Sequence, residues 1–197
     1  MQCDLWFPTP VWSKVLDIDN NKIYNLCKLK QSQDTGRIIS NQYGWQSKDI
    51  EISKETLLQE LLDNIYFCSA AALDCYKFDT KHKRLAITSL WININDNDYS
   101  YNKVHVHAGG VLSGVYYVKC ADQSGKLCFP RNANEEYILN STGEVVESNT
   151  FNYGEAKYSP MEKKLILFPA WVPHYVENNA DGKERISISF NLGLYNE

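Results

Sequence analysis

Three of the four histidines in this 197-residue chain occur in a pattern suited to metal binding. Neutral imidazole is the commonest side-chain metal ligand, and it suits iron, zinc, copper and nickel. His105 and His107 lie in a segment of strand-like composition. Residues i and i+2 of a strand point to the same side, with Cα atoms roughly 6.5 Å apart, so one strand can present both imidazoles to one ion. An isolated pair of this kind is more often two polar residues on an exposed strand face.

Residues further along the chain favour the metal site. The apolar run from Leu165 to Pro169 predicts a buried strand, and His174 follows it after a short turn. We therefore expect His174 just beyond a strand end, where the mouth of a barrel would lie. Arg185 begins the next strand, and its guanidinium can hold a carboxylate in a bidentate pair. Ser187 lies on the same strand face and adds a hydroxyl donor.

The elements that position these residues are mostly short strands. Gly, Asn, Asp and Pro separate several runs rich in β-branched and aromatic residues, and this pattern favours an antiparallel sandwich or jelly roll over a βαβ fold. The polar stretch 131–160 is interpreted as a hairpin insertion over one end of the barrel. The expected strands are Leu85 to Asn95, Val104 to His107, Val111 to Cys120, Leu127 to Phe129, Tyr137 to Leu139, Leu165 to Phe168 and Arg185 to Leu192.

Helices are expected only in the first third of the chain. Apolar residues at helical spacing predict one helix from Asp19 to Leu29, and Ser53 is placed as the cap of a second. The second helix carries a broad apolar stripe that we assign to core packing: Leu58, Leu61, Leu62, Ile65, Cys68, Ala72 and Leu73. We expect a single domain over 1–197, with a partly helical support in 1–83 and a jelly-roll core in 84–197 that carries the insertion 131–160.

The strand from Arg185 to Leu192 alternates strictly between polar and apolar residues. Arg185, Ser187, Ser189 and Asn191 share one face, and isoleucine, phenylalanine and leucine share the other. Such a polar face either lies in water or looks into a ligand-filled barrel, and the pattern alone does not decide between them. The same two alternatives apply to the segment that contains Trp91, Asn93 and Asn95.

Composition excludes some partners and leaves others open. The net charge of −4 and the pI of about 5.6 do not indicate the basic surface that is typical of nucleic-acid-binding proteins. No apolar run is long enough to span a membrane. The N-terminus resembles no secretion signal, and the six cysteines lack C-x-x-C spacing, so we expect reduced thiols in the cytoplasm. Neither the substrate, whether a small molecule or a protein, nor the oligomeric state follows from the sequence, and a homodimer stays open.

In its metal-binding pattern and in several further motifs, the chain resembles the Fe(II)/2-oxoglutarate-dependent dioxygenases, in particular a 2-oxoglutarate oxygenase family of marine bacteriophages and some bacteria. The resemblance covers most of the chain. The residues that carry it are His105-Val-His107, Leu112-Ser-Gly-Val-Tyr-Tyr-Val118, Phe168-Pro169, Pro173-His174, Arg185-Ile-Ser-Ile-Ser189, the N-terminal Trp6-Phe-Pro-Thr-Pro-Val-Trp12 and the segment NQYGWQS from Asn41 to Ser47.

The resemblance implies a double-stranded β-helix and an enzyme that uses Fe(II), with 2-oxoglutarate as co-substrate. It implies that His105, His107 and His174 act as catalytic metal ligands and that Arg185 pairs with the distal carboxylate of 2-oxoglutarate. Tyr117 falls where prolyl-hydroxylase-like relatives place a tyrosine against the co-substrate, and Asn93 and Ser187 are further candidates for co-substrate binding. The implied reaction hydroxylates a substrate and releases succinate and CO2, in the host cytoplasm if the chain is phage-encoded.

The metal ligands depart from the usual non-haem iron pattern of two histidines and one carboxylate, because His107 stands where the carboxylate is expected. We favour a three-histidine site. In the alternative, His107 is the first ligand and Gly109 takes the carboxylate position, which leaves room for an exogenous anion.

Two other functions compete with the dioxygenase. One is a different three-histidine metalloenzyme, either a zinc hydrolase or a cupin-type dioxygenase, and the other is a non-catalytic jelly-roll binding module. For the dioxygenase, the segments 41–47 and 131–160 are expected to cover the substrate, with Tyr43 and Trp45 available to stack on it.

Overall fold

The computed structural model describes residues 1–78, 80–180 and 182–197. Its helices are α1 (Asn20–Gln33), the short 3-10 helices η1 (Ile52–Lys54) and η2 (Thr56–Leu58), α2 (Gln59–Asp74) and α3 (Ala133–Thr142). Its strands are β1 (Trp12–Val15), β2 (Asn41–Gln42), β3 (Trp45–Gln46), β4 (Lys83–Asn95), β5 (Tyr101–His105), β6 (Leu112–Lys119), β7 (Leu127–Pro130), β8 (Glu155–Tyr158), β9 (Lys164–Pro169), β10 (His174–Val176) and β11 (Arg185–Asn196).

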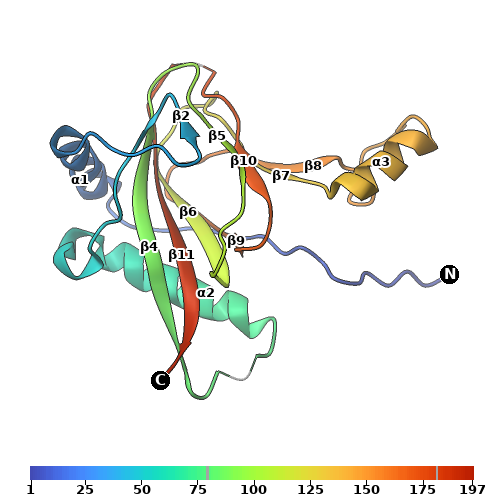
Figure 1. The fold of residues 1–197 in the computed structure, drawn as a ribbon, viewed down its shortest axis with the longest axis horizontal. Helices are drawn as coiled ribbons and strands as arrows, with labels where there is room; N and C mark the ends of the chain where they lie inside the picture. The colour runs from blue at the N-terminus through green and yellow to red at the C-terminus, as the bar shows by residue number, and fades with distance from the viewer. Residues whose placement is uncertain (79, 181) are drawn as a thin grey trace.

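The strands form two antiparallel sheets that face one another (Figure 1). The larger sheet has the order β1-β9-β6-β11-β4-β3, and the smaller one has the order β2-β5-β10-β7-β8. Strand β11 lies between β4 and β6 and pairs along its length with β4, from Arg185 opposite Asn95 to Asn196 opposite Lys83. The polar face predicted for β11 is therefore held in the centre of the larger sheet, beside the residues of β4 that carry the same alternation.

Helices α1 and α2 cover the outer face of the larger sheet (Figure 1). The apolar residues of β11 and β4 pack against them, and Ile186, Ile188, Phe190 and Leu192 are completely buried there. The stripe predicted on the second helix is buried as expected, with Cys68 only partly so. A second, smaller cluster fills the space between the sheets, where Tyr117, Phe129 and Phe168 pack together. Because the main core lies on the helical side, part of the inner face of the sheet remains available for polar residues.

Several local predictions were wrong. The stretch Tyr137 to Leu139 is helical, within α3, because the Asn132 side chain accepts from the Asn134 N–H and caps a helix whose first turn is acidic. The segment 131–160 is therefore a helix followed by β8 rather than a hairpin. Figure 1 shows α3 lying away from the two sheets, not over the barrel mouth.

The start of the second helix also differs from its prediction. Ser53 lies inside η1 and does not cap α2, which begins at Gln59 after two successive 3-10 turns. The first helix begins as predicted, since the Asp19 side chain accepts from the Asn21 N–H, and it continues to Gln33. Among the described residues, none of the helices has the length and apolar character needed to cross a lipid bilayer.

Candidate metal centre and co-substrate pocket

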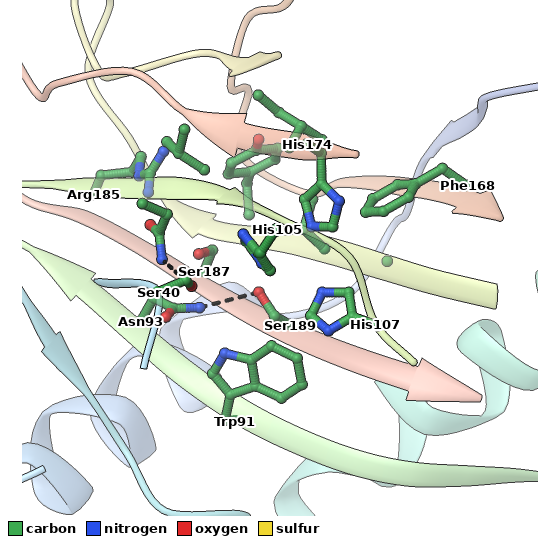
Figure 2. A pocket seen from close by; sticks show the side chains of 16 residues that line it. Ser40, Trp91, Asn93, His105, His107, Phe168, His174, Arg185, Ser187 and Ser189 are labelled. Atoms are coloured by element: carbon green, nitrogen blue, oxygen red, sulfur yellow. Dashed lines mark hydrogen bonds between the residues drawn. The ribbon is translucent and has the colours of Figure 1, made fainter. Parts of the chain in front are cut away.

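The three histidines that the sequence singled out lie together between the sheets. His105 is the last residue of β5 and lies opposite His174, the first residue of β10. The ring centroids are 4.3 Å apart for His105 and His174, 4.9 Å for His105 and His107, and 5.0 Å for His107 and His174. Figure 2 shows the three imidazoles turned toward one another.

The spacing of His105 and His107 predicted that both lie on one strand, but only His105 does. Strand β5 ends at His105, and His107 lies in the irregular segment that follows, where its backbone N–H donates to Ala170 O at 3.0 Å. This contact with the end of β9 fixes His107 from the opposite sheet. The pair converges because two sheets hold it, not because of strand alternation.

The donor set fits a divalent transition metal. One ligand atom from each histidine can be chosen so that all three lie within 4.8 Å of one another. Imidazole nitrogens about 2.1 Å from a shared ion lie at most about 4.2 Å apart, so small inward shifts would complete the site. No carboxylate belongs to this group among the described residues. Gly109 lies in an exposed turn with φ +83.

Backbone contacts orient two of the imidazoles. The Nδ1 atom of His105 lies 2.7 Å from Lys103 O, and that of His174 lies 2.9 Å from Val172 O. In neutral rings this places the proton on Nδ1 and leaves Nε2 free to bind a metal. Burial lowers the pKa of all three histidines, to about 4 for His107 and about 3 for His174, with the neighbouring His105 adding to both shifts. The cluster is therefore neutral near pH 7, which is the form that coordinates metal.

Arg185 lies at the far end of the same cavity from the histidines (Figure 2). It is 2% exposed, its Nη1 donates to Gly125 O at 2.8 Å, and its Nη2 donates to Asn95 Oδ1 at 3.3 Å. Its Nε is buried with no partner, and among the described residues no carboxylate forms an ion pair with it. Burial lowers its pKa from the ordinary value. A buried guanidinium that meets only neutral acceptors is suited to bind an anion.

The other predicted co-substrate residues line the cavity beside Arg185. Ser187 is 3% exposed, and on the sheet it lies opposite Tyr117 on one side and Asn93 on the other. Burial raises the pKa of Tyr117 to about 12, so its hydroxyl stays protonated and can donate. Asn93 donates to Ser189 Oγ at 3.0 Å, while its own Oδ1 is buried without a partner. The polar faces of β11 and β4 thus look into the barrel, which answers the question that their alternation left open.

Two hollows meet at the histidines. The inner cavity runs between the sheets from Arg185 to His174 and encloses about 50 Å³. An outer cleft of about 460 Å³ opens beyond it. Ser40, Trp91, His105 and His107 line both of them. A metal at the histidines would therefore stand at the boundary between an enclosed anionic-ligand pocket and an open cleft.

Some contacts of the site were not predicted. Asn191 lies 3.4 Å from His107 Nδ1 through its amide nitrogen, and the Trp91 ring centroid is 5.7 Å from that of His107. Both residues were visible in the alternation of their strands, but not their contact with the histidine. Trp45 does not stack over the site, because its Nε1 donates to Asp34 O and it packs on the main core. Tyr43 is 72% exposed and contacts other tyrosines instead.

A family model described as "Putative 2OG-Fe(II) oxygenase" matches residues 89–191, which are 103 of the 197 residues and include the three clustered histidines and Arg185. The chain therefore belongs to the 2OG-Fe(II) oxygenase family. A search of curated protein sequences finds no match.

Three solved structures illustrate the likeness of fold. A prolyl-4-hydroxylase from Pseudomonas putida is 12% identical with a TM-score of 0.65, covering 94% of this chain and 92% of its own. A viral collagen prolyl hydroxylase from Paramecium Bursaria Chlorella virus-1, in complex with 2-oxoglutarate, is 12% identical with a TM-score of 0.58, covering 92% and 94%. HygX from Streptomyces hygroscopicus, solved with nickel and 2-oxoglutarate, is 8% identical with a TM-score of 0.62, covering 94% and 83%.

At these identities the likeness establishes the fold, and it confirms the predicted double-stranded β-helix. Family membership and the histidine cluster define the activity class. The chain is a 2-oxoglutarate-dependent dioxygenase, an oxidoreductase that uses Fe(II) with 2-oxoglutarate as co-substrate.

Proposed function

We propose that this enzyme hydroxylates a substrate bound in the outer cleft, with release of succinate and CO2 from 2-oxoglutarate held in the inner cavity. In this proposal His105, His107 and His174 hold Fe(II). Arg185 holds the distal carboxylate of 2-oxoglutarate, and Ser187, Tyr117 and Asn93 donate to the co-substrate or position it. The substrate would bind in the outer cleft, on the opposite side of the metal from the inner cavity.

The observation that carries the assignment is the buried Arg185. Its Nε has no partner, and the cavity that joins it to the histidines is lined by polar and apolar groups, with no carboxylate among the described residues that line it. The distal carboxylate of 2-oxoglutarate supplies the negative counter-charge that this guanidinium lacks within the protein. The other end of 2-oxoglutarate is a keto acid, which is suited to chelating a metal at the histidines. The cavity has room for roughly four water-sized groups, so side chains along it would shift outward to admit the whole co-substrate.

Fe(II) would supply the O2 activation that couples decarboxylation of 2-oxoglutarate to oxidation of the substrate. The protein's own part is positioning and exclusion of water. Backbone carbonyls hold the Nδ1 protons of His105 and His174, so both rings offer Nε2. Phe168 packs on His174, with ring centroids 4.6 Å apart, and closes that side of the cluster to water. Tyr117 stays protonated and can donate without supplying a competing anion.

We infer further properties from the sequence segments and the thiols. The N-terminal segment and NQYGWQS support a place among the phage and bacterial members of the family. All six cysteines are free thiols, and Cys27 and Cys128 are buried, which supports action in a reducing cytoplasm. We treat 1–197 as one domain, with the helices of 1–83 supporting the barrel of 84–197 and 131–160 as its insertion. A homodimer stays a hypothesis.

Succinate production tests the proposal. Purified protein supplied with Fe(II), 2-oxoglutarate and O2 should form succinate, slowly without the substrate, and His174→Ala should abolish it. The matched control is His82→Ala, which removes an exposed histidine outside the cluster and should leave the rate unchanged. A zinc hydrolase, a cupin-type dioxygenase or a binding module would form no succinate, and that result would overturn the proposal.

A further inference from the structure

Two side chains that line the outer cleft each carry a buried polar atom that no protein group satisfies. Gln46 is 3% exposed, and its Oε1 is buried without a hydrogen-bond partner. Arg37 lines the same cleft, and its Nε is also buried without a partner. Buried polar groups are nearly always paired, because an unmade hydrogen bond costs free energy. Both side chains line the same cleft, so a ligand that enters it and shifts them slightly would supply the missing donor and acceptor.

Strand pairing explains why Gln46 faces this cleft. Strand β3 pairs with β4, with Trp45 opposite Ile94 and Gln46 opposite Asn93. Trp45 and Ile94 belong to the core on the helical side, whereas Asn93 lines the inner cavity. Since neighbouring residues of a strand point to opposite faces, Gln46 points toward the interior of the barrel.

The backbone around Gly36, which precedes Arg37, holds Arg37 beside Gln46. The Arg37 backbone N–H donates to Gln46 O at 2.8 Å. Gly36 adopts φ +78, and a Cβ there would meet the Trp45 ring at 2.6 Å, so only glycine lets the chain pass at this distance. The guanidinium is held from its other end, where Nη2 donates to Asp49 Oδ1 at 2.5 Å. The charge of Arg37 is thus paired within the protein, and its Nε–H is the donor that lacks a hydrogen-bond partner.

The rest of the cleft is suited to an apolar body. Trp91 forms part of the floor next to His107, and Ile39, Val104 and Val106 line the cleft with 63%, 59% and 49% of their surfaces exposed. Its volume of about 460 Å³ lies within the range of small-molecule sites, which is roughly 300–1,000 Å³. The apolar residues lie close to the histidines, so a substituent packed on them would lie near the metal.

We propose that the outer cleft recognises a carboxamide on the substrate. The amide nitrogen donates to Gln46 Oε1, the amide oxygen accepts from Arg37 Nε, and an aliphatic substituent packs against Trp91 and the valines. This inference rests on the proposed function, because it takes the cleft beside the histidines as the substrate site. A carboxylate is the natural competitor, since Lys103 also lines the cleft, but it brings no donor for Gln46.

Binding of two matched probes tests the proposal. Protein loaded with diamagnetic Zn(II) and 2-oxoglutarate is titrated with 4-methylpentanamide and with 4-methylpentanoate, and dissociation constants are measured by ligand-observed NMR. We expect the amide to bind roughly tenfold more tightly than the acid, the effect of one buried hydrogen bond. Gln46→Met should remove this preference, and Arg37→Lys, which keeps a cation near Asp49, should reduce it. The matched control is Gln42→Leu, because Gln42 lines neither hollow.

A peptide arm distinguishes the two sources of a carboxamide. An acetylated, methylamidated Ala-Ala-Gln-Ala-Ala peptide should bind more tightly than the small amide if the carboxamide is a side chain of a protein, and no more tightly if the substrate is a free small molecule. Equal binding of amide and acid, or an unchanged preference in Gln46→Met, would overturn the proposal. The absorption band of the Fe(II) protein with 2-oxoglutarate, recorded on the same variants, separates this failure from failure of the proposed function, which would remove the band from the wild type.

Discussion

Replacing Arg185 by methionine should separate binding of the co-substrate from binding of the metal. The guanidinium is 2% exposed and lies across the inner cavity from the histidines, so the substitution removes an anion partner without touching the cluster. Methionine fills a similar volume and carries no charge. We expect the variant to bind Fe(II) as the wild type does and to bind 2-oxoglutarate far more weakly.

The magnitude follows from the burial of the pair. Opposite unit charges about 4 Å apart attract by about 4 kcal/mol at an effective dielectric constant of about 20. Removing one partner of a buried, hydrogen-bonded charge pair in an interface costs about 2–5 kcal/mol. A value of about 3 kcal/mol raises the dissociation constant of 2-oxoglutarate on the order of 100-fold.

The same structure predicts the opposite effect on the stability of the ligand-free protein. Arg185 is a buried cation that pairs with no carboxylate among the described residues, and a buried uncompensated charge destabilises the fold. Arg185→Met should therefore leave the melting temperature of the apoprotein unchanged or raise it, by about 2–4 °C for each kcal/mol gained. Addition of 2-oxoglutarate with metal should then stabilise the wild type more than the variant.

Anaerobic calorimetry gives the dissociation constant of Fe(II) from the metal-free protein and that of 2-oxoglutarate from the Fe(II)-loaded protein, and a thermal melt gives the stability. Arg84→Met is the matched control, because Arg84 is exposed on β4 and the variant should bind both ligands as the wild type does. Equal affinity of wild type and Arg185→Met for 2-oxoglutarate would refute the anchor role. A parallel loss of Fe(II) affinity would refute the claim that the two sites are separate.

Three further predictions concern acid, packing and thiols. In the metal-free protein, the free energy of unfolding should fall as the pH drops from about 6.5 toward 3. Burial lowers the pKa of His174 to about 3, so the unfolded chain binds more protons in that window. In urea unfolding, His174→Asn should flatten this slope by up to about 1.4 kcal/mol per pH unit, and His82→Asn should not; equal slopes would contradict the buried neutral imidazole. Gly114→Ala should lower the free energy of unfolding by about 1–3 kcal/mol, because its Cβ would lie 2.4 Å from a phenylalanine ring carbon, and an unchanged urea midpoint would contradict that packing. A thiol reagent at pH 8 should modify the exposed Cys3 in the folded protein but Cys27 only in urea, since burial raises the pKa of Cys27 to about 12; mass spectrometry that finds Cys27 labelled without urea would contradict its burial.

The strand carrying Arg185 shows what the sequence could predict. Its alternation identified the face that carries Arg185, Ser187 and Ser189, because the period of a strand depends only on local geometry. Whether that face met water or a cavity depended on the partner sheet, which a local pattern cannot reveal. The structure answered it by covering the apolar face with helices and leaving the polar face toward the smaller sheet.

Other features escaped prediction for different physical reasons. Helix α3 is exposed and has no buried residue, so its three apolar neighbours Tyr137 to Leu139 imitated a strand, and the capping Asn132 was the overlooked signal. The position of His107 comes from a contact with the end of a strand more than 60 residues away in sequence. Gln46 lies in a two-residue strand, which is too short to give any periodicity, and Arg37 lies in the irregular segment before β2.

An anaerobic titration of Fe(II) into protein saturated with 2-oxoglutarate tests the central claim most directly. The three-histidine account predicts a weak visible charge-transfer band that saturates at about one iron per chain and is lost in His107→Ala. His82→Ala should keep the band. A band that persists unchanged in His107→Ala would contradict the role of His107 as a ligand, and a wild-type protein that shows no band would contradict the assignment of iron and 2-oxoglutarate to this site.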